Sequence, residues 1–150
     1  MVEARADVTL PVPPAEAFAA ATDLRHADWL PAVRGLRHIG GPEVGLDAQY
    51  EVEVGIIGRN LHGVLICTES AAPTRAVFSL EQGRRLDLSI IIQVRAVRGG
   101  CKLEVTAKYA VGGGPFGGAV EKASAGAARH EVARAVENLA ARLGRKSLAG

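Results

Sequence analysis

The chain has 150 residues, of which 48% are hydrophobic and 23% are charged, and its formal net charge is +2. This length suits one domain with a substantial core, and this composition is typical of a globular protein, which excludes disordered and fibrous classes. The net charge is small, and the Lys and Arg residues are scattered along the chain without a dense basic run. We therefore expect no nucleic-acid partner.

The N-terminal segment is predicted to be a β-strand. Apolar residues occupy every second position from Val2 to Val12, and polar residues or proline fill the positions between them. A period of two is typical of a strand with one buried face. Prolines at positions 11, 13 and 14 end the strand, and Pro14 suits the first turn of a following helix.

Two short helical segments are predicted next. The first is PAEAFAAAT, with Ala17, Phe18 and Ala21 on one side. The second covers residues 23–30 and is stopped by Pro31, because proline cannot continue a helix. The segment contains Trp29, the one tryptophan of the chain.

Six further strands are predicted between residues 33 and 111. Each is a run of alternating or continuous apolar residues, and Gly or Pro lies in the gaps between them. The predicted strands cover residues 33–39, 49–54, 59–69, 75–81, 86–94 and 101–111. Short gaps between successive strands indicate an antiparallel meander.

The last element is predicted to be one long amphipathic helix over residues 119–143. This segment is rich in Ala, Arg and Glu, and Val132, Val136, Leu139 and Leu143 fall at helical spacing. Residues 144–150 are expected to form a frayed tail. The helix is the element able to cover the sheet, but a twisted sheet does not lie flat against a straight helix. We therefore predict a cavity of on the order of 300 Å³ or more between the sheet and this helix.

The order of elements and several motifs resemble the START-like superfamily, also called the helix-grip or birch-pollen-allergen-like fold. Within it, the chain is similar to the bacterial polyketide cyclase/dehydrase and lipid transport branch. The motifs are PPAEAFAAATD, the W-x-P-x-V of Trp29, Pro31 and Val33, GLDAQY, CTESAAPTRAVFSL and YAVGGGPFGG. The resemblance implies an α+β fold over residues 1–150 as a single domain. It implies a seven-stranded antiparallel sheet, in the order β-α-α-β6-α, wrapped around the C-terminal helix.

The resemblance also implies a deep apolar cavity between the sheet and the helix, in which family members carry lipids, hormones or polyketides, or fold reactive intermediates into rings. Trp29 would line the entrance or wall of that cavity, or else be a plain core residue. The expected lining is Trp29, Tyr50, Arg59, Phe78, Leu88, Ile90, Leu103, Val105, Tyr109 and Phe116.

Arg59 is the charged residue that breaks the strand pattern. Its parity with Leu61, Leu65 and Cys67 places it on the inner face, where it would anchor a carbonyl or carboxylate of the ligand. The alternative is that Arg59, at a strand start after Gly58, leans into water. If the cavity is catalytic, the candidates for proton transfer are Arg59, His62 and Tyr109. His62 is also consistent with a solvent-facing strand residue.

The glycine motif, the histidines and the cysteines give no indication of a bound cofactor or metal. Gly112, Gly114 and Gly117 form a G-x-G-x-x-G, but the strands before them form a meander and no strand follows, so we interpret the motif as a turn. The four histidines have no metal-binding spacing, and we expect neither a metal nor a cofactor. The isolated Cys67 and Cys101 are predicted to be free thiols.

The predicted function is binding of a small hydrophobic, lipid- or polyketide-like molecule in the cavity. A polyketide aromatase/cyclase acting on a poly-β-ketone is the first alternative, and a module that binds a protein partner is the second. No signal-peptide block is present, and the run LDLSIIIQV is too short to span a bilayer. We expect a cytoplasmic monomer or homodimer without stable membrane insertion.

Overall fold

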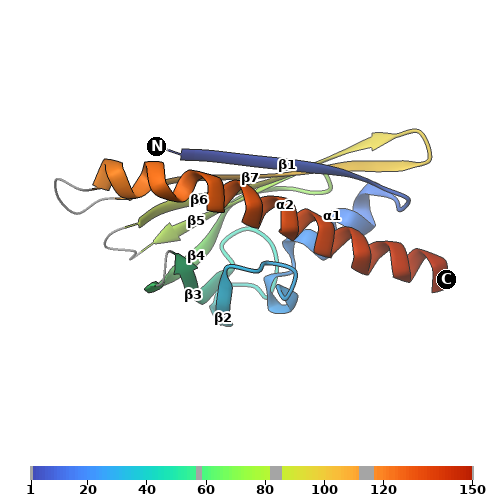
Figure 1. Ribbon diagram of the computed structural model, residues 1–150. Coiled ribbons are helices and arrows are strands. Elements are labelled where there is room, and N and C mark those ends of the chain that lie inside the picture. The colour runs from blue at the N-terminus through green and yellow to red at the C-terminus, as the bar shows by residue number, and fades with distance from the viewer. Residues whose placement is uncertain (1, 57–58, 82–85, 112–116, 150) are drawn as a thin grey trace.

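The protein contains one antiparallel sheet and one long C-terminal helix. A computed structural model describes residues 2–56, 59–81, 86–111 and 117–149 (Figure 1). In chain order the elements are β1 (Val2–Leu10), α1 (Pro14–Thr22), the 3-10 helix η1 (Leu24–His26), β2 (Val33–Gly40), β3 (Gln49–Ile56), β4 (Arg59–Ala71), β5 (Arg75–Glu81), β6 (Leu86–Val97), β7 (Gly100–Val111) and α2 (Gly117–Ala149).

The seven strands pair in the order β1-β7-β6-β5-β4-β3-β2, and every neighbouring pair is antiparallel. Strands β2 to β7 therefore form the predicted meander, and β1 closes the far edge by pairing with β7, with Leu10 opposite Cys101. The predicted α+β class and the seven-stranded sheet with a C-terminal helix are confirmed.

The two faces of the sheet follow the alternation in the sequence. Along β1, Ala4 and Leu10 are 1% exposed, whereas Glu3, Arg5 and Asp7 are exposed or partly exposed on the other face. The same rule holds in β6, where Ile92 and Val94 are buried. Because side chains alternate along a strand, one face of the curved sheet is continuous with the core.

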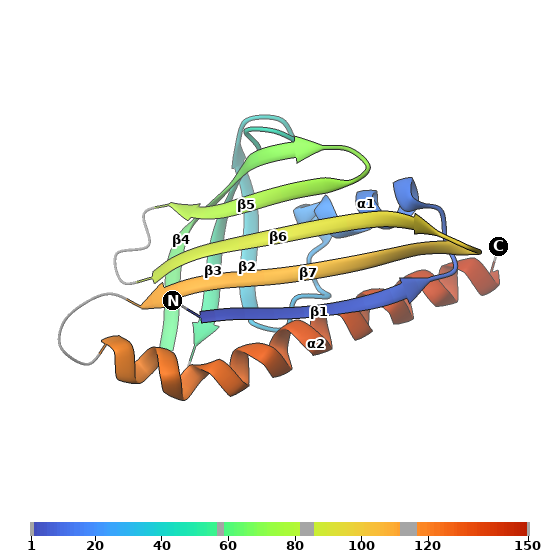
Figure 2. The ribbon, with the colours of Figure 1, turned by 90° about the horizontal axis from the view of Figure 1, so that it is seen from above.

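Helix α2 runs alongside the edge strand β1 (Figure 2) and contacts both β1 and β7. Strands β2–β4 turn away from the direction of β5–β7, so the sheet is strongly twisted and curls toward the helix. Toward its C-terminus α2 packs into the core through Val136, Leu139 and Leu143, which are all buried. At that end the helix also meets α1, whose buried side chains are Ala17, Phe18, Ala21 and Thr22.

Two helices differ from their predicted extents. The expected helical segment 23–30 is reduced to η1, which Asp23 caps by accepting a hydrogen bond from the backbone N–H of Arg25. The carbonyl oxygens of His26 and Trp29 accept hydrogen bonds from side chains of α2. Helix α2 continues past Leu143 to Ala149, because no proline follows to stop it.

The β2–β3 connection depends on a glycine in the left-handed region. Gly41 has a φ of +67°, and a Cβ atom there would collide with the backbone carbonyl of Asp47. The predicted GGPEVG turn thus needs glycine for both conformation and space. None of the described helices is long and apolar enough to cross a lipid bilayer.

Candidate ligand-binding cavity

A cavity of about 360 Å³ lies between the sheet and α2, and its volume agrees with the size predicted from the sequence. We call it the sheet–helix cavity. Its lining comes from the η1–β2 segment, from β3, β4, β6 and β7, and from α2. The lining residues are Leu30, Pro31, Ala32, Val33, Arg34, Val54, Gly55, Asn60, Leu65, Leu88, Ile90, Val105, Ala107, Tyr109, Ala127, Ala128, Glu131, Val132 and Ala135.

Small side chains on α2 create the space. Ala127 and Ala128 face the cavity from one turn of the helix and Ala135 from two turns further along, whereas the larger Leu139 and Leu143 pack the core nearer its C-terminus. Where the helix carries alanine, its side chains fall short of the twisted sheet, and the gap remains open. The sheet side of the gap is formed by branched apolar residues such as Ile90 and Val105.

A short run of the chain, residues 30–34, forms one wall of the sheet–helix cavity. It is held by backbone hydrogen bonds at both ends, from Val33 to the Leu30 carbonyl (3.2 Å) and from Gly55 to the Ala32 carbonyl (2.8 Å). Trp29 directly precedes it and is 2% exposed. The amide of Asn138 on α2 donates to the Trp29 carbonyl at 3.3 Å, which ties this wall to the helix.

Four polar residues interrupt the apolar lining: Arg34, Asn60, Tyr109 and Glu131. The guanidinium of Arg34 lies over Gly55, where a Cβ atom would come within 2.8 Å of Nε. Glu131 is partly buried on α2, and its Oε2 is buried without a hydrogen-bond partner among the described residues. Such a cavity, mainly apolar with a few polar groups, is typical of small-molecule sites.

The residues expected to line the cavity fall into three groups. Leu88, Ile90, Val105 and Tyr109 lie in the lining of the sheet–helix cavity. Four others are buried in the core, between 0% and 2% exposed, and are absent from that lining as far as the described residues define it: Trp29, Tyr50, Phe78 and Leu103. Phe116 and the side chain of Arg59 lie outside the described part of the chain.

The backbone of Arg59 begins β4 and pairs with Ile56. Because the side chain of Arg59 lies outside the described part of the chain, its role as an anchor stays a prediction. His62 is on the solvent side of the sheet: its side chain is 71% exposed, and Nε2 lies 3.7 Å from Oε1 of Glu53. Of the three candidates for proton transfer, Tyr109 lines the cavity.

The sequence analysis did not find Arg34, Asn60 or Glu131. A signal existed for Glu131, since it stands one residue before Val132 and four before Ala135, beside the apolar stripe of α2. Helical periodicity alone leaves such a flanking residue between the core and water. Residues 112–116 of the G-x-G-x-x-G motif lie outside the described residues, and Gly117 begins α2.

Both cysteines are free thiols and are buried. Burial raises the pKa of the Cys67 thiol and of the Cys101 thiol, which keeps them protonated near neutral pH. Within the ranges that the structure describes, no three His, Cys, Asp or Glu side chains gather in a way that could hold a metal ion.

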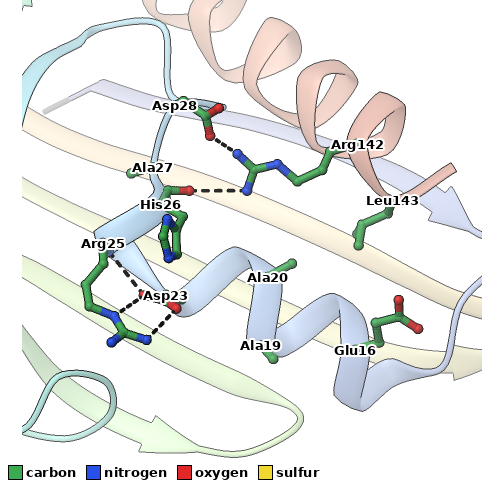
Figure 3. A pocket seen from close by; sticks show the side chains of 10 residues that line it. All are labelled: Glu16, Ala19, Ala20, Asp23, Arg25, His26, Ala27, Asp28, Arg142 and Leu143. Carbon is green, nitrogen blue, oxygen red and sulfur yellow. Dashed lines mark hydrogen bonds and ion pairs between the residues drawn. The ribbon is translucent and has the colours of Figure 1, made fainter. Parts of the chain in front are cut away.

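A second hollow, of about 610 Å³, lies between α1, η1 and the C-terminal part of α2 (Figure 3). We call it the α1–α2 cleft. Charged side chains surround it, namely Glu16, Asp23, Arg25, Asp28 and Arg142. Arg142 pairs with Asp28 and also donates to the His26 carbonyl at 3.2 Å. The cleft is larger than the sheet–helix cavity, and charged side chains form much more of its lining.

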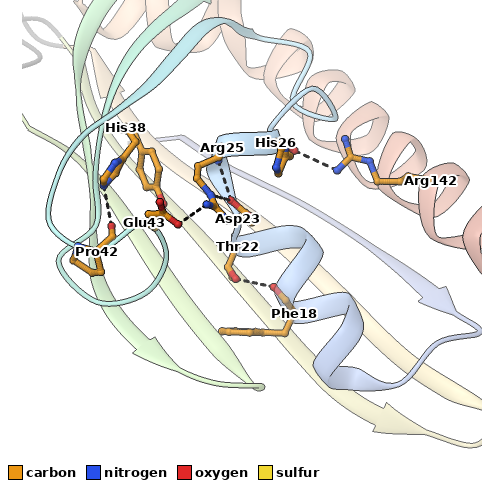
Figure 4. Close-up of polar contacts among 10 residues, drawn as sticks. Phe18, Thr22, Asp23, Arg25, His26, His38, Pro42, Glu43 and Arg142 are labelled. Carbon is orange, nitrogen blue, oxygen red and sulfur yellow. Dashed lines mark hydrogen bonds and ion pairs between the residues drawn. The ribbon is translucent and has the colours of Figure 1, made fainter.

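Two further charged residues of the cleft, Asp23 and Arg25, are paired as well (Figure 4). Two nitrogens of Arg25, Nε and Nη2, donate to the two carboxylate oxygens of Asp23, each at 2.9 Å, and Nη1 donates to Glu43 at 2.6 Å. The Arg25 guanidinium lowers the pKa of Asp23 below its usual value. Tyr50 donates to the Glu43 carbonyl nearby, so this network ties η1 to the β2–β3 connection.

The sequence of the whole chain supplies the decisive comparison. A model of the family described as polyketide cyclase/dehydrase and lipid transport matches residues 1–144. The chain belongs to this family. A comparison with curated proteins found none that matches this chain in sequence.

Solved structures agree with the family in fold. The protein TTHA0849 from Thermus thermophilus is 19% identical, with a TM-score of 0.82, over 97% of this chain and 99% of that chain. The Zhui aromatase/cyclase from Streptomyces sp. R1128 is 10% identical, with a TM-score of 0.79, over 97% and 94%. A START superfamily protein from Mycobacterium smegmatis is 15% identical, with a TM-score of 0.73, over 95% and 97%. At such identities the structural similarity establishes the START-like fold of this chain. It does not identify the ligand.

Proposed function

We propose that the protein binds a small hydrophobic molecule, lipid- or polyketide-like, in the sheet–helix cavity. The observation that carries this proposal is a hollow of about 360 Å³ in which Leu, Ile, Val, Ala, Pro and Tyr side chains form most of the wall. Apolar burial supplies about 25 cal/mol for each Å² removed from water, so such a cavity favours an apolar guest. The family to which the chain belongs includes lipid transport in its description.

The position of the cavity supports the same proposal. It is bounded by β6 and β7 on one side and by the alanine-rich stretch of α2 on the other, so a guest would lie between the two layers of the fold. An empty cavity destabilises the fold, because the side chains that line it lose the dispersion contacts of a filled core. A bound apolar molecule restores those contacts.

Native mass spectrometry of the full chain, purified from its own host, tests the proposal. We expect an additional mass that is released on denaturation and that extracts into organic solvent. Ala128→Phe would place a ring in the cavity from the helix side, and this variant should carry no such mass. A guest that is retained by Ala128→Phe at the same level would show that it binds elsewhere, and the proposal would fail.

An aromatase/cyclase activity in the same cavity is the second candidate. Two ionisable side chains in the lining, Tyr109 and Glu131, are of the types that transfer protons in enzymes, and an apolar wall would hold a poly-β-ketone folded. The fold of the Zhui aromatase/cyclase is similar to the fold of this chain. Incubation of the protein with an unreduced poly-β-ketone chain, followed by chromatography of the products, tests it: an unchanged product distribution in the presence of protein would reject catalysis.

A further inference from the structure

Among the described residues that line the sheet–helix cavity, Glu131 is the acidic one. It lies in the middle of α2, on the face that also carries Ala127, Ala128 and Ala135, and all four line the cavity. Its Oε2 is buried and has no hydrogen-bond partner among the described residues. Arg34 also lines the cavity, yet no ion pair joins it to Glu131 within the described part of the chain.

The fold alone gives no reason for a carboxylate here. Glu131 is far from both ends of α2, so it neither caps the helix nor meets its dipole. A buried carboxylate oxygen without a donor costs free energy, on the order of 1–3 kcal/mol or more for a charged group. Its three alanine neighbours on the same face leave room beside it for another molecule.

An ionised carboxylate can only accept hydrogen bonds. A ligand that offers it a hydroxyl or an N–H removes the cost of the unpartnered oxygen, and hydrogen bonds to charged groups are the stronger kind. A ligand that offers only a carbonyl or ether oxygen places lone pairs against lone pairs. Glu131 therefore discriminates between ligands of the same apolar shape.

We propose that Glu131 selects, among the apolar ligands of the sheet–helix cavity, those that carry a hydrogen-bond donor, such as an alcohol, a phenol or an ammonium group. The inference rests on the proposed binding function and adds the chemical class of the ligand to it. The carboxylate accepts from the donor, while the apolar body lies between Ile90 and Val105 of the sheet and the alanines of α2.

Three neutral probes of similar shape separate donor recognition from apolar burial: naphthalene, 2-methoxynaphthalene and 2-naphthol. Calorimetric titration of the full chain should show that 2-naphthol binds at least about tenfold more tightly than 2-methoxynaphthalene, the ratio expected for one hydrogen bond to a charged group. A fourth probe, 1-naphthylmethylamine, carries an ammonium group. Its affinity relative to 2-naphthol shows whether the natural donor is cationic or a neutral hydroxyl.

Glu131→Leu should abolish the preference, with 2-naphthol and 2-methoxynaphthalene then binding within about twofold of each other. The variant should also unfold at a higher temperature, because it removes a buried oxygen that has no partner. Glu131→Gln keeps an acceptor of the same shape, so it should retain part of the preference for 2-naphthol over 2-methoxynaphthalene. Any advantage of 1-naphthylmethylamine over 2-naphthol in the wild-type protein should be lost in this variant, because the negative charge is gone. Glu137→Gln on the same helix, at an exposed position, is the matched control and should change none of these ratios.

The outcomes separate the two proposals. Equal affinities of the wild-type protein for 2-naphthol and 2-methoxynaphthalene, or a preference that survives in Glu131→Leu, overturn the role of Glu131 while the binding function stands. Binding of none of the probes overturns the binding function and the role of Glu131 with it.

Discussion

The two hollows of this protein differ in size and in how their polar groups are satisfied. The α1–α2 cleft is the larger, about 610 Å³ against about 360 Å³, but four of its charged side chains pair with one another, Arg25 with Asp23 and Arg142 with Asp28. The sheet–helix cavity is smaller and mostly apolar, and it contains a carboxylate oxygen, Oε2 of Glu131, that has no hydrogen-bond partner among the described residues. Volume alone would favour the cleft as the site.

Paired charges leave little binding capacity for a ligand, because a guest would have to break existing ion pairs. An apolar wall has no competing partner to displace except water. The comparison therefore favours the sheet–helix cavity over the α1–α2 cleft as the proposed binding site.

Trp29 separates the two hollows along the chain. Residues 26–28 line the cleft and residues 30–34 line the cavity, whereas Trp29 between them is buried. Trp29→Ala should lower the free energy of unfolding by about 3–5 kcal/mol, the usual cost of truncating a buried aromatic side chain. Urea unfolding followed by circular dichroism measures it.

Trp29→Phe is the control for that experiment. The indole N–H of Trp29 has no hydrogen-bond partner among the described residues, so the phenyl ring loses packing but no hydrogen bond. We expect clearly less than half of the effect of alanine. If alanine cost under about 1 kcal/mol, the tryptophan would not be a core residue in solution.

Substitutions of alanine by phenylalanine test the two hollows directly. Ala128→Phe fills the sheet–helix cavity from α2, and Ala20→Phe fills the α1–α2 cleft from α1. Ala128→Phe should weaken binding of naphthalene about a hundredfold, the equivalent of roughly 100 Å² of lost apolar burial. Ala20→Phe should leave the dissociation constant unchanged, as calorimetric titration would show.

The reverse result would contradict the comparison. Loss of naphthalene binding in Ala20→Phe with full binding in Ala128→Phe would place the guest in the cleft.

Arg59 offers a sharper test of polarity in the sheet–helix cavity, because the sequence predicts that it anchors a carbonyl or carboxylate there. Arg59→Ala should weaken binding of 2-naphthoic acid about tenfold, as expected for loss of a hydrogen bond between charged groups, and should leave 2-methylnaphthalene unaffected. Equal losses for both ligands would mean that the residue only shapes the cavity. No change for either would mean that it faces water.

The smallest expected effect belongs to the cleft and depends on pH. Because Arg25 lowers the pKa of Asp23 in the folded state, the stability that the pair contributes is present above 3.8, the usual value, and is lost as the pH falls through the lowered pKa. Because Arg25 is exposed, solvent screening keeps this contribution small. The urea midpoints of wild type and Asp23→Asn should differ at pH 6 and converge below pH 3.8. A difference that persists at pH 2 would show that Asp23 acts through something other than its charge.

The sequence by itself determined the sheet and its faces. Alternation in β1, β6 and β7 predicted which side chains are buried, because side-chain direction in a strand is local to the strand. Glycine and proline between the runs predicted the antiparallel meander, because the preference of these residues for tight turns is also local to the chain. The four branched residues of α2 at helical spacing predicted the face that packs, and Leu139 and Leu143 are 0% and 1% exposed.

Only the tertiary structure decided which inward residues meet a cavity and which meet each other. Leu103 and Val105 have the same parity in β7, yet Leu103 is sealed in the core and Val105 lines the cavity opposite the alanine-rich stretch of α2. The same geometry turns Glu131, a flanking residue by periodicity, toward the sheet. Burial follows from local pattern, but empty space depends on the distance between two layers, and that distance is set by the twist of the whole sheet.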